Sequence, residues 1–282
     1  MLTPQRRTFA NNTFMKKVIV FFGLVLLATP FYGQETPQEI TREEDELAKE
    51  LLNPVANLIS VPFQSNFDFG IGPADGSRWF MNIQPVVPIS IGEDWNLIGR
   101  AILPVISQND IFGNSGSQTG LGDLILSGFF SPKEPTKGGI IWGAGPALLI
   151  PTATDNLMGT GQFGIGPTAV VLKQAGSFTI GALANHIWSV AGDSDRPDVN
   201  ATFFQPFIAR NFAGGYAVAL NTELSQDWGQ NATIGFVHLI GSKVLKLGNQ
   251  LSQVFIGPRI PYGNANAVGW GLRAGITVMF TK

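Results

Sequence analysis

The sequence predicts an all-β protein, a transmembrane antiparallel β-barrel of the outer-membrane type with about 12 strands. Three observations predict it: a shortage of charge, a hydrophobic period of two, and connections that alternate in length. Only 13% of the 282 residues are charged, against about 25% in a typical soluble domain. The 34 glycines and 18 prolines favour strands and turns over long helices. Much of the surface is therefore expected to contact something other than water.

Residues 1–33 are predicted to be a signal peptide, with the mature chain beginning near Gln34. Lys16 and Lys17 lead directly into the apolar run from Val18 to Ala28, which is the order of a basic region and a hydrophobic region in an export signal. As a helix this run would rise only about 16 Å, well short of a hydrocarbon core of about 30 Å. It is expected to be cleaved and not to anchor the protein.

Residues 34–57 form an acidic segment that is expected to lie in the periplasm. The spacing of Thr41 and Glu44 fits a capping box, and leucines recur at helical intervals after it. A short helix is predicted from about 42 to 53, ending before Pro54. Such a segment can plug or gate a pore, but a solvated spacer is the favoured interpretation.

Residues 58–282 are assigned to the barrel because their hydrophobic pattern has a period of two. That period is typical of a strand with two different faces. In the first segment Ile59 and Phe63 share an apolar face, and Gln64 lies on the polar one. The last segment alternates in the same way and ends at Phe280, close to the C-terminus. An aromatic at that position is expected to be read by the barrel-assembly machinery.

The connections between the predicted strands alternate between short and long. Gly92 to Asp94 is a short one and Pro151 to Gly161 is a long one. If the first strand runs outward from the periplasm, the long connections lie outside, as they do in transmembrane barrels. The six tryptophans lie at or near predicted strand ends, where an amphipathic ring can sit at the headgroup level; they are Trp79, Trp95, Trp142, Trp188, Trp228 and Trp270.

The inward face of the predicted barrel is polar and mixed in sign. Its expected pore-lining residues are Gln64, Asn66, Asp68, Asn82, Gln84, Asn96, Arg100, Asp123, Ser127, Asn221, Glu223, Arg273 and Thr277. In a wide lumen such residues would wet the passage and tune its selectivity. In a filled lumen the arginines would instead pair with the carboxylates as a structural network. Twelve strands lie between filled 8-stranded barrels and open 16-stranded porins, so both interpretations stay open.

Motifs for chemistry are sparse, and the protein is not expected to be an enzyme. Gly164 to Ala169 spells a dinucleotide loop, but it continues into an apolar strand where a helix would be required. His186 and Ser189 are three residues apart and would point to opposite faces of a strand, which argues against a lipid hydrolase. His238 is expected to point inward, which leaves the phase of its strand unsettled. No cofactor or metal is expected, and the near balance of 18 basic and 20 acidic residues disfavours nucleic acid.

Motifs along nearly the whole mature chain resemble a family of bacterial proteins usually labelled putative transporters, many of them under the name neuromedin U. The motifs are ELAKELLNPVANLISVPFQ (46–64), NIQPVVP (82–88), EDWNLI (93–98), LPVISQ (103–108), GLGD (120–123), FSPK (130–133), IPTATD (150–155) and GALANHIWSVAG (181–192). The sequence is similar, more distantly, to barrels of the meta-pathway of phenol degradation. The resemblance implies an outer-membrane protein that passes small molecules, with aromatic compounds as candidates, and it supplies no catalytic residue.

These observations predict a bacterial outer-membrane channel or transporter for small solutes, hydrophobic or aromatic compounds among them. Its expected partners are the lipid bilayer, the barrel-assembly machinery and the solute. The first alternative is a structural or adhesive barrel with a filled lumen, and the second is an outer-membrane lipid hydrolase.

Overall fold

The computed structural model describes residues 37–264 and 268–280. The predicted signal peptide lies outside the described residues. One helix and 14 strand segments are present in the described part of the chain. They are α2 (Pro37–Glu50), β1 (Ile59–Ile71), β2 (Gly76–Ile83), β3 (Val86–Ile91), β4 (Trp95–Asn109), β5 (Ser117–Leu121), β6 (Leu124–Pro132), β7 (Ile140–Ile150), β8 (Gln162–Ala175), β9 (Phe178–Gly192), β10 (Asn200–Phe212), β11 (Tyr216–Asp227), β12 (Ala232–Leu247), β13 (Gln250–Tyr262) and β14 (Trp270–Phe280).

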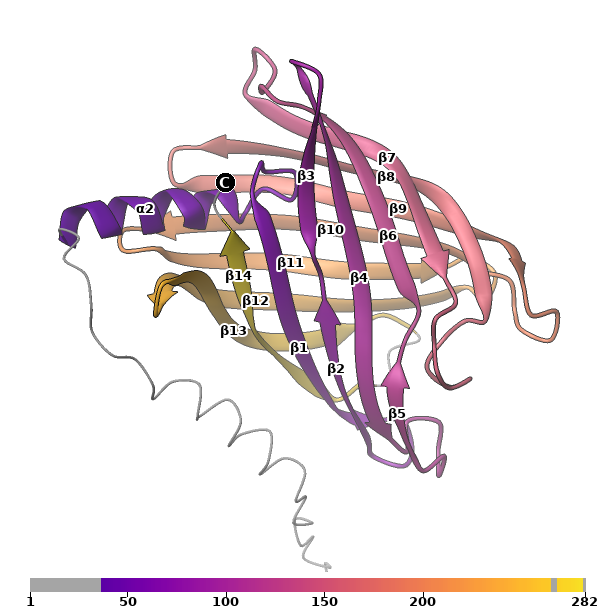
Figure 1. Ribbon diagram of the computed structural model, residues 1–282. Helices are drawn as coiled ribbons and strands as arrows, with labels where there is room; N and C mark the ends of the chain where they lie inside the picture. The colour runs from indigo at the N-terminus through magenta and orange to yellow at the C-terminus, as the bar shows by residue number, and fades with distance from the viewer. Residues whose placement is uncertain (1–36, 265–267, 281–282) are drawn as a thin grey trace, which may run out of the picture.

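The strands close on themselves as an antiparallel barrel (Figure 1). Closure is made by β1 and β14, which pair from Ile59 opposite Phe280 to Phe69 opposite Trp270. The 14 segments form 12 barrel strands, because two strands are interrupted. β2 and β3 both pair with β1 and β4, and β5 and β6 both pair with β4. The predicted fold and strand number are confirmed, and the pairing of β1 with β14 leaves neither the first nor the last strand as a free edge of the sheet.

The two interruptions have local causes. Pro85, between β2 and β3, has no N–H to give to the sheet, although its carbonyl still accepts from Ala101 N at 3.1 Å. Gly122, between β5 and β6, lies close to β4: a Cβ there would be 2.9 Å from Ile106 Cδ1 and 3.1 Å from Pro104 Cγ, so a larger residue would require these side chains to shift.

The outward face of the wall is apolar, as the alternation predicted. In β14 the even-numbered residues face outward, whereas Arg273, Thr277 and Met279 are buried inside. Large aliphatic side chains elsewhere on the wall, including Ile180 and Ile256, are each 57% exposed. This exposure has a physical reason in a lipid environment and would be costly in water.

Tryptophans gather near both ends of the wall. Trp95 and Trp142 form an edge-to-face pair, with ring centroids 5.9 Å apart, at the end of the barrel where β4 and β7 begin. Trp188, Trp228 and Trp270 are exposed toward the opposite end. Tryptophans at both ends of an apolar wall are typical of the two headgroup levels of a bilayer.

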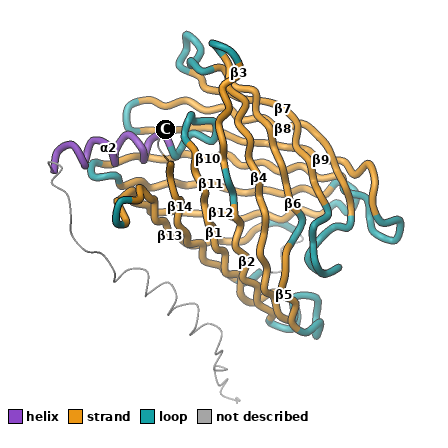
Figure 2. Tube along the Cα trace, viewed as in Figure 1, coloured by secondary structure: helices purple, strands orange, loops and turns teal. Residues whose placement is uncertain are grey.

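The connections have the expected asymmetry (Figure 2). Residues 151–161 and 193–199 make long connections at the outer end, and residues 213–215 and 248–249 make short turns at the inner end. The connection between β1 and β2 at the outer end is short, because residues 72–75 alone join the two strands.

Helix α2 begins earlier than predicted, at Pro37 and not near residue 42, and it ends at Glu50. Proline is favoured in the first turn of a helix, where its missing N–H costs nothing, so the spacing of Thr41 and Glu44 does not mark the helix start. Figure 1 shows α2 beside the carboxyl end of β14, across the inner end of the barrel. Within the described residues, no helix is both long and apolar enough to cross a membrane.

Candidate functional site: the barrel lumen

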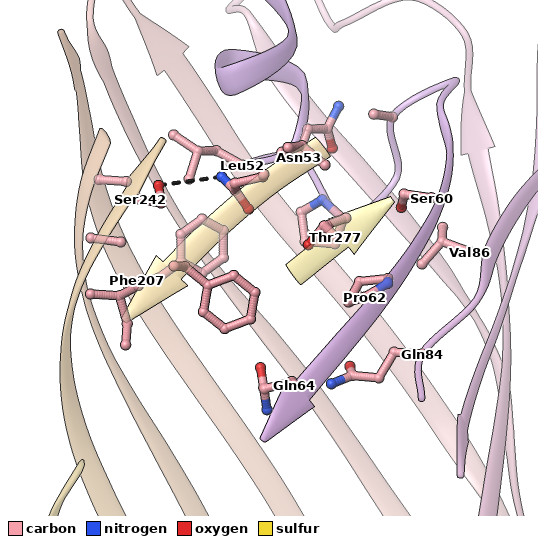
Figure 3. Close-up of a pocket in the computed structure, with 18 of the residues that line it drawn as sticks. Leu52, Asn53, Ser60, Pro62, Gln64, Gln84, Val86, Phe207, Ser242 and Thr277 are labelled. Carbon is pink, nitrogen blue, oxygen red and sulfur yellow. Dashed lines mark hydrogen bonds between the residues drawn. The ribbon is translucent and has the colours of Figure 1, made fainter. Parts of the chain in front are cut away.

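The lumen contains a cavity of about 280 Å³. Its lining mixes amide, hydroxyl and guanidinium groups with a few apolar side chains. Figure 3 shows Leu52 and Asn53, from the segment after α2, at one end of the cavity, and Gln64 and Gln84 deeper in the barrel. Gln253 Nε2 donates to Ser242 Oγ at 3.3 Å on the lining. The cavity is therefore polar on much of its surface, unlike the packed core of a soluble domain.

A layer of ion pairs crosses the lumen beyond the cavity. Arg273 donates from Nη1 and Nη2 to the two carboxylate oxygens of Glu223, at 2.7 and 2.9 Å. Arg259 and Arg78 both reach Asp68, at 2.9 and 3.0 Å. These side chains come from β1, β2, β11, β13 and β14, which lie within one continuous stretch of the wall from β11 to β2, so the layer links the strands of that stretch on their inward side.

His238 lies inside this layer. Its side chain is fully buried, its Nδ1 is 3.0 Å from Asn221 Oδ1, and its Nε2 is 3.1 Å from Arg259 Nη1. Phe236 also faces inward, and the Arg259 guanidinium lies 3.2 Å from the centre of its ring. The unsettled phase of β12 is thereby fixed: even-numbered residues point into the lumen, and an aromatic residue occupies an inward position because a cation stacks on it.

Arg100 is the cation that faces the cavity without a carboxylate partner. Its Nη2 donates to Gln84 Oε1 at 2.6 Å, and no carboxylate of the described residues lies within 4.0 Å of it. The lumen thus holds four guanidiniums, those of Arg78, Arg100, Arg259 and Arg273, around the two carboxylates Asp68 and Glu223. The charged residues that line the cavity itself are Arg100, Arg273 and, from α2, Glu50.

The inner mouth is covered by α2. Leu47 and Ala48 are buried against Val244, Leu251 and Met279 on the barrel strands. Polar contacts fix the two ends of the contact region: Asp45 Oδ1 accepts from Gly215 N at 2.7 Å, and Gln174 Nε2 donates to Lys49 O at 2.9 Å. Glu43 and Lys246 add an ion pair at 3.4 Å. Residues 43–50 of the acidic segment therefore contact the barrel.

The residues after α2 continue into the lumen. Val55 is buried with Ile98, Phe129 and Leu172. Gly143 on β7 makes room for it, since a Cβ there would lie 3.2 Å from Val55 Cγ1. Chain and wall are therefore complementary at this point.

Two acidic side chains of α2 have pKa values above the usual carboxyl value. Burial, followed by the neighbouring Glu46 carboxylate, raises the pKa of Glu50 above its usual value. Burial is also the main cause that raises the pKa of Glu44, with Asp45 and Glu43 adding to the rise and Lys243 and Lys246 opposing it. Both acids are thus more easily protonated in the docked helix than in free chain.

The outer mouth is narrowed by residues 151–161. Asp123 anchors this loop by accepting from Thr160 N at 2.6 Å, Thr160 Oγ1 at 2.7 Å and Ala153 N at 3.2 Å. Arg196 donates to the carbonyls of Asn156 and Gly159. The loop packs on the inward side of β5, where Gly120 leaves space for Thr154 and Met158.

The structure distributes the 13 expected lining residues over four settings. Six line the cavity: Gln64, Gln84, Arg100, Asn221, Arg273 and Thr277. Arg273 also belongs to the ion-pair layer, together with Asn66, Asp68 and Glu223. Asn82 and Ser127 lie opposite Gln64 and Arg100 in register, and Asn96 is buried on the inward side of β4. Asp123 anchors the outer loop and lies apart from the cavity.

Sequence reasoning missed Arg78, Arg259 and the aromatic side chains Phe207 and Phe255 of the lining. A signal for Arg259 exists, because Ile256, Pro258 and Ile260 alternate outward around it. The inward aromatics carry no such signal, since an apolar ring at an inward position cannot be told from a lipid-facing one by composition.

The described residues hold no Ser–His pair of a hydrolase. His186 faces outward, with Nδ1 2.7 Å from Thr202 Oγ1 and its ring against Trp188. Ser189 Oγ donates to Asp198 instead, at 3.0 Å. No group of three or more His, Asp or Glu residues suited to a metal ion occurs among the described residues either.

Comparison with solved structures agrees with the geometry. The chain is similar to the COG4313 outer membrane channel from Pseudomonas putida F1, with a TM-score of 0.62 at 15% identity over 79% of this chain and 94% of that one. The fold is that of an outer-membrane β-barrel. Weaker likenesses, too low in score to carry a functional comparison, are to the Salmonella typhi outer membrane phospholipase (TM-score 0.45, 9% identity, 85% and 98% covered) and the beta domain of a Bordetella autotransporter (0.43, 14%, 79% and 100%).

No protein-family model matches the sequence, and no curated protein matches it. Nothing in the comparisons supports the neuromedin U label. The outer-membrane barrel is nevertheless placed by its structure: it lies in the bacterial outer membrane with its apolar wall against the lipid bilayer. Its lumen is the part of the molecule that is available for function.

Proposed function

We propose that the barrel is an outer-membrane channel that passes small solutes. The observation that carries the proposal is the polar cavity of about 280 Å³ inside a closed, lipid-facing wall. A barrel built only for structure gains stability by filling its lumen with packed side chains. Here amides such as Gln64 and Asn221 instead face open space.

The inner mouth is proposed to open by release of residues 37–58. This segment contacts the barrel through the apolar cluster around Leu47, the burial of Val55 among wall side chains, the Glu43–Lys246 ion pair and hydrogen bonds. These are side-chain and turn contacts, so they can be lost without disturbing the hydrogen-bonded wall. The segment is therefore proposed to act as a plug, with the docked form as the closed state.

The solutes are proposed to be small and to include aromatic compounds. Phe207 and Phe255 line the same cavity as the amide groups of Gln64 and Gln84. Such a lining offers both a flat apolar surface and polar groups that orient a ligand. The cavity volume limits the solute to one small molecule.

Planar-bilayer recording of the full-length protein tests the proposal. The sequence contains no cysteine, so Glu43→Cys and Lys246→Cys can be joined by a short bis-thiosulfonate linker that a reductant removes. The two positions form an ion pair at 3.4 Å between the native side chains. The linked protein is expected to be silent, and reduction is expected to restore unitary currents.

A matched control keeps the thiol at position 246 and moves the second thiol from α2 to the barrel. Both thiols of the Lys133→Cys and Lys246→Cys variant lie on the barrel, so this protein should conduct with and without the linker. Absence of current from correctly folded, reduced protein, shown by heat-modifiable gel migration, would contradict the channel.

A structural or adhesive barrel with a filled lumen is the second candidate. The ion-pair layer favours it, because Arg259 and Arg273 are buried and their carboxylate partners are engaged. The same bilayer recording separates the two: this candidate predicts silence even after release of α2.

We also propose that β14 is read by the barrel-assembly machinery. Phe280 closes the strand, faces outward and is 46% exposed. Replacement of Phe280 by Ala is expected to reduce the amount of folded barrel in the membrane, measured by heat-modifiable migration, whereas Phe212→Ala at an internal strand end should not.

A further inference from the structure

We propose that the cavity binds a small organic carboxylate, with Arg100 as the group that recognises the anion. The proposal rests on the proposed channel function, because a solute reaches this cavity only through the lumen. It names the class of solute: a monocarboxylate with an apolar body about the size of one ring.

The charge of Arg100 is the first support. A guanidinium has five N–H donors, and Arg100 uses Nη2 for Gln84 Oε1 at 2.6 Å. Its counterparts in the layer are satisfied by carboxylates: Arg273 by Glu223, and Arg78 and Arg259 by Asp68. A cation removed from bulk water without a counterion is unfavourable, so an anion that enters the cavity is stabilised there.

The position of Arg100 is the second support. Arg100 lines the same cavity as Arg273, Gln64 and Asn221. Glu223, whose carboxylate would otherwise neutralise the region, already accepts two hydrogen bonds from Arg273 and one from Arg259 at 3.4 Å. Arg273 is thus paired, and Glu50 is the acidic residue that lines the cavity, so Arg100 is the cation that is left to meet a ligand.

The shape of the lining is the third support. A carboxylate is planar and accepts two parallel hydrogen bonds from a guanidinium. Beside Arg100, the amide of Gln64 can donate a further hydrogen bond, while Phe207, Phe255 and Leu52 offer apolar surface on the cavity wall. A ligand with a charged end and an apolar end matches this division.

Equilibrium dialysis of radiolabelled benzoate against folded, full-length protein in detergent tests the proposal without requiring transport. Benzoate is expected to bind, and benzyl alcohol, its uncharged counterpart, is expected to compete at least about tenfold more weakly, since a charge-assisted hydrogen bond contributes about 1.5–3 kcal/mol. No binding of benzoate, or equal competition by benzyl alcohol, would overturn the proposal.

Two variants assign the binding to Arg100. Arg100→Gln removes the charge, and Gln84→Glu keeps Arg100 but places a carboxylate beside it in nearly the same volume. Both are expected to weaken benzoate binding at least about tenfold. Lys137→Gln, in an exposed turn, changes the net charge equally and should bind as the native protein does. If one variant fails to fold, the other decides: unchanged binding in either folded variant contradicts the site.

The result is separable from the channel. Benzoate binding together with silence in the bilayer would leave the carboxylate site standing and reject conduction. Conduction without benzoate binding would support the channel and reject the site.

Discussion

Arg273 on β14 and Glu223 on β11 form a two-pronged ion pair inside the lumen, with N–O distances of 2.7 and 2.9 Å. The two residues are 50 positions apart in the chain and two strands separate them in the wall. The pair therefore links strands that are not direct neighbours, on the inward side of the wall.

Glu223→Gln is expected to destabilise the barrel by about 3 kcal/mol, because Arg273 is left buried without its charge partner. Urea unfolding in lipid vesicles measures this change. Asp227 is the last residue of the same strand, and its side chain accepts one hydrogen bond from Gln230 N in the turn that follows. Asp227→Asn should therefore lower the free energy of unfolding by about 1 kcal/mol or less. Equal losses in the two variants would show that the pair contributes nothing specific.

Leu47→Asp is expected to release α2 and to increase the open fraction of the channel. Leu47 is 7% exposed in the apolar cluster at the inner mouth, and loss of its burial costs about 2 kcal/mol before the cost of burying a carboxylate is added. Bilayer recording measures the open fraction. Arg42→Ala, on the exposed side of the helix, serves as the control, and a closed Leu47→Asp channel would contradict the plug.

Docking of α2 is expected to weaken as the pH rises. The pKa of Glu50 is raised in the docked helix, mainly by burial, so the docked form holds this proton more tightly than the released form does. The contribution of Glu50 to the stability of the docked helix is complete at a pH below the usual carboxyl pKa. It is lost as the pH rises through the raised pKa of the docked form. Glu44 acts in the same direction.

Glu50→Gln isolates this effect from the Glu43–Lys246 pair, which requires an ionised carboxylate and opposes it. The variant is expected to conduct less than the native protein at pH 7 and equally near pH 4. Open fractions recorded at both pH values provide the measurement. The prediction would be contradicted if the native channel closed as the pH rose while the open fraction of Glu50→Gln stayed constant.

Asp123→Asn is expected to loosen residues 151–161 at the outer mouth. The aspartate accepts three hydrogen bonds from this loop, and an amide cannot accept from all three donors with the same strength. Limited proteolysis of reconstituted protein should cut this loop faster than in the native barrel. Asp195→Asn, in the exposed loop 193–199, should leave the rate unchanged.

The alternation of apolar and polar residues predicted most of the wall correctly. In β1 and β14 every assignment of Gln64, Asn66, Asp68, Arg273 and Thr277 to the inward side agrees with the structure. One face of these strands contacts lipid and the other contacts the polar lumen. The alternation of apolar and polar residues is therefore regular in β1 and β14 and indicates which residues point inward.

Other features depended on contacts between distant segments and could not be predicted. Phe236 points inward because Arg259, from the neighbouring strand, stacks on it. The docking of α2 depends on complementary surface on β12, β13 and β14, and a helical period reveals an apolar stripe without revealing what covers it. Asp123 was expected to line the pore, but the loop that binds its carboxylate is long and has no repeating pattern.

The central claim is that a wet, positively charged chamber lies inside a lipid-facing wall, and adjacent residues of β1 test it most directly. Gln64→Cys places a thiol on the cavity lining and Phe63→Cys places one on the opposite face. In reconstituted vesicles, the thiol at 64 should react with a water-soluble thiosulfonate reagent, faster with an anionic form than with a cationic one, and the thiol at 63 should react only with a lipid-soluble maleimide. Aqueous labelling at 63 with protection at 64 would contradict the account.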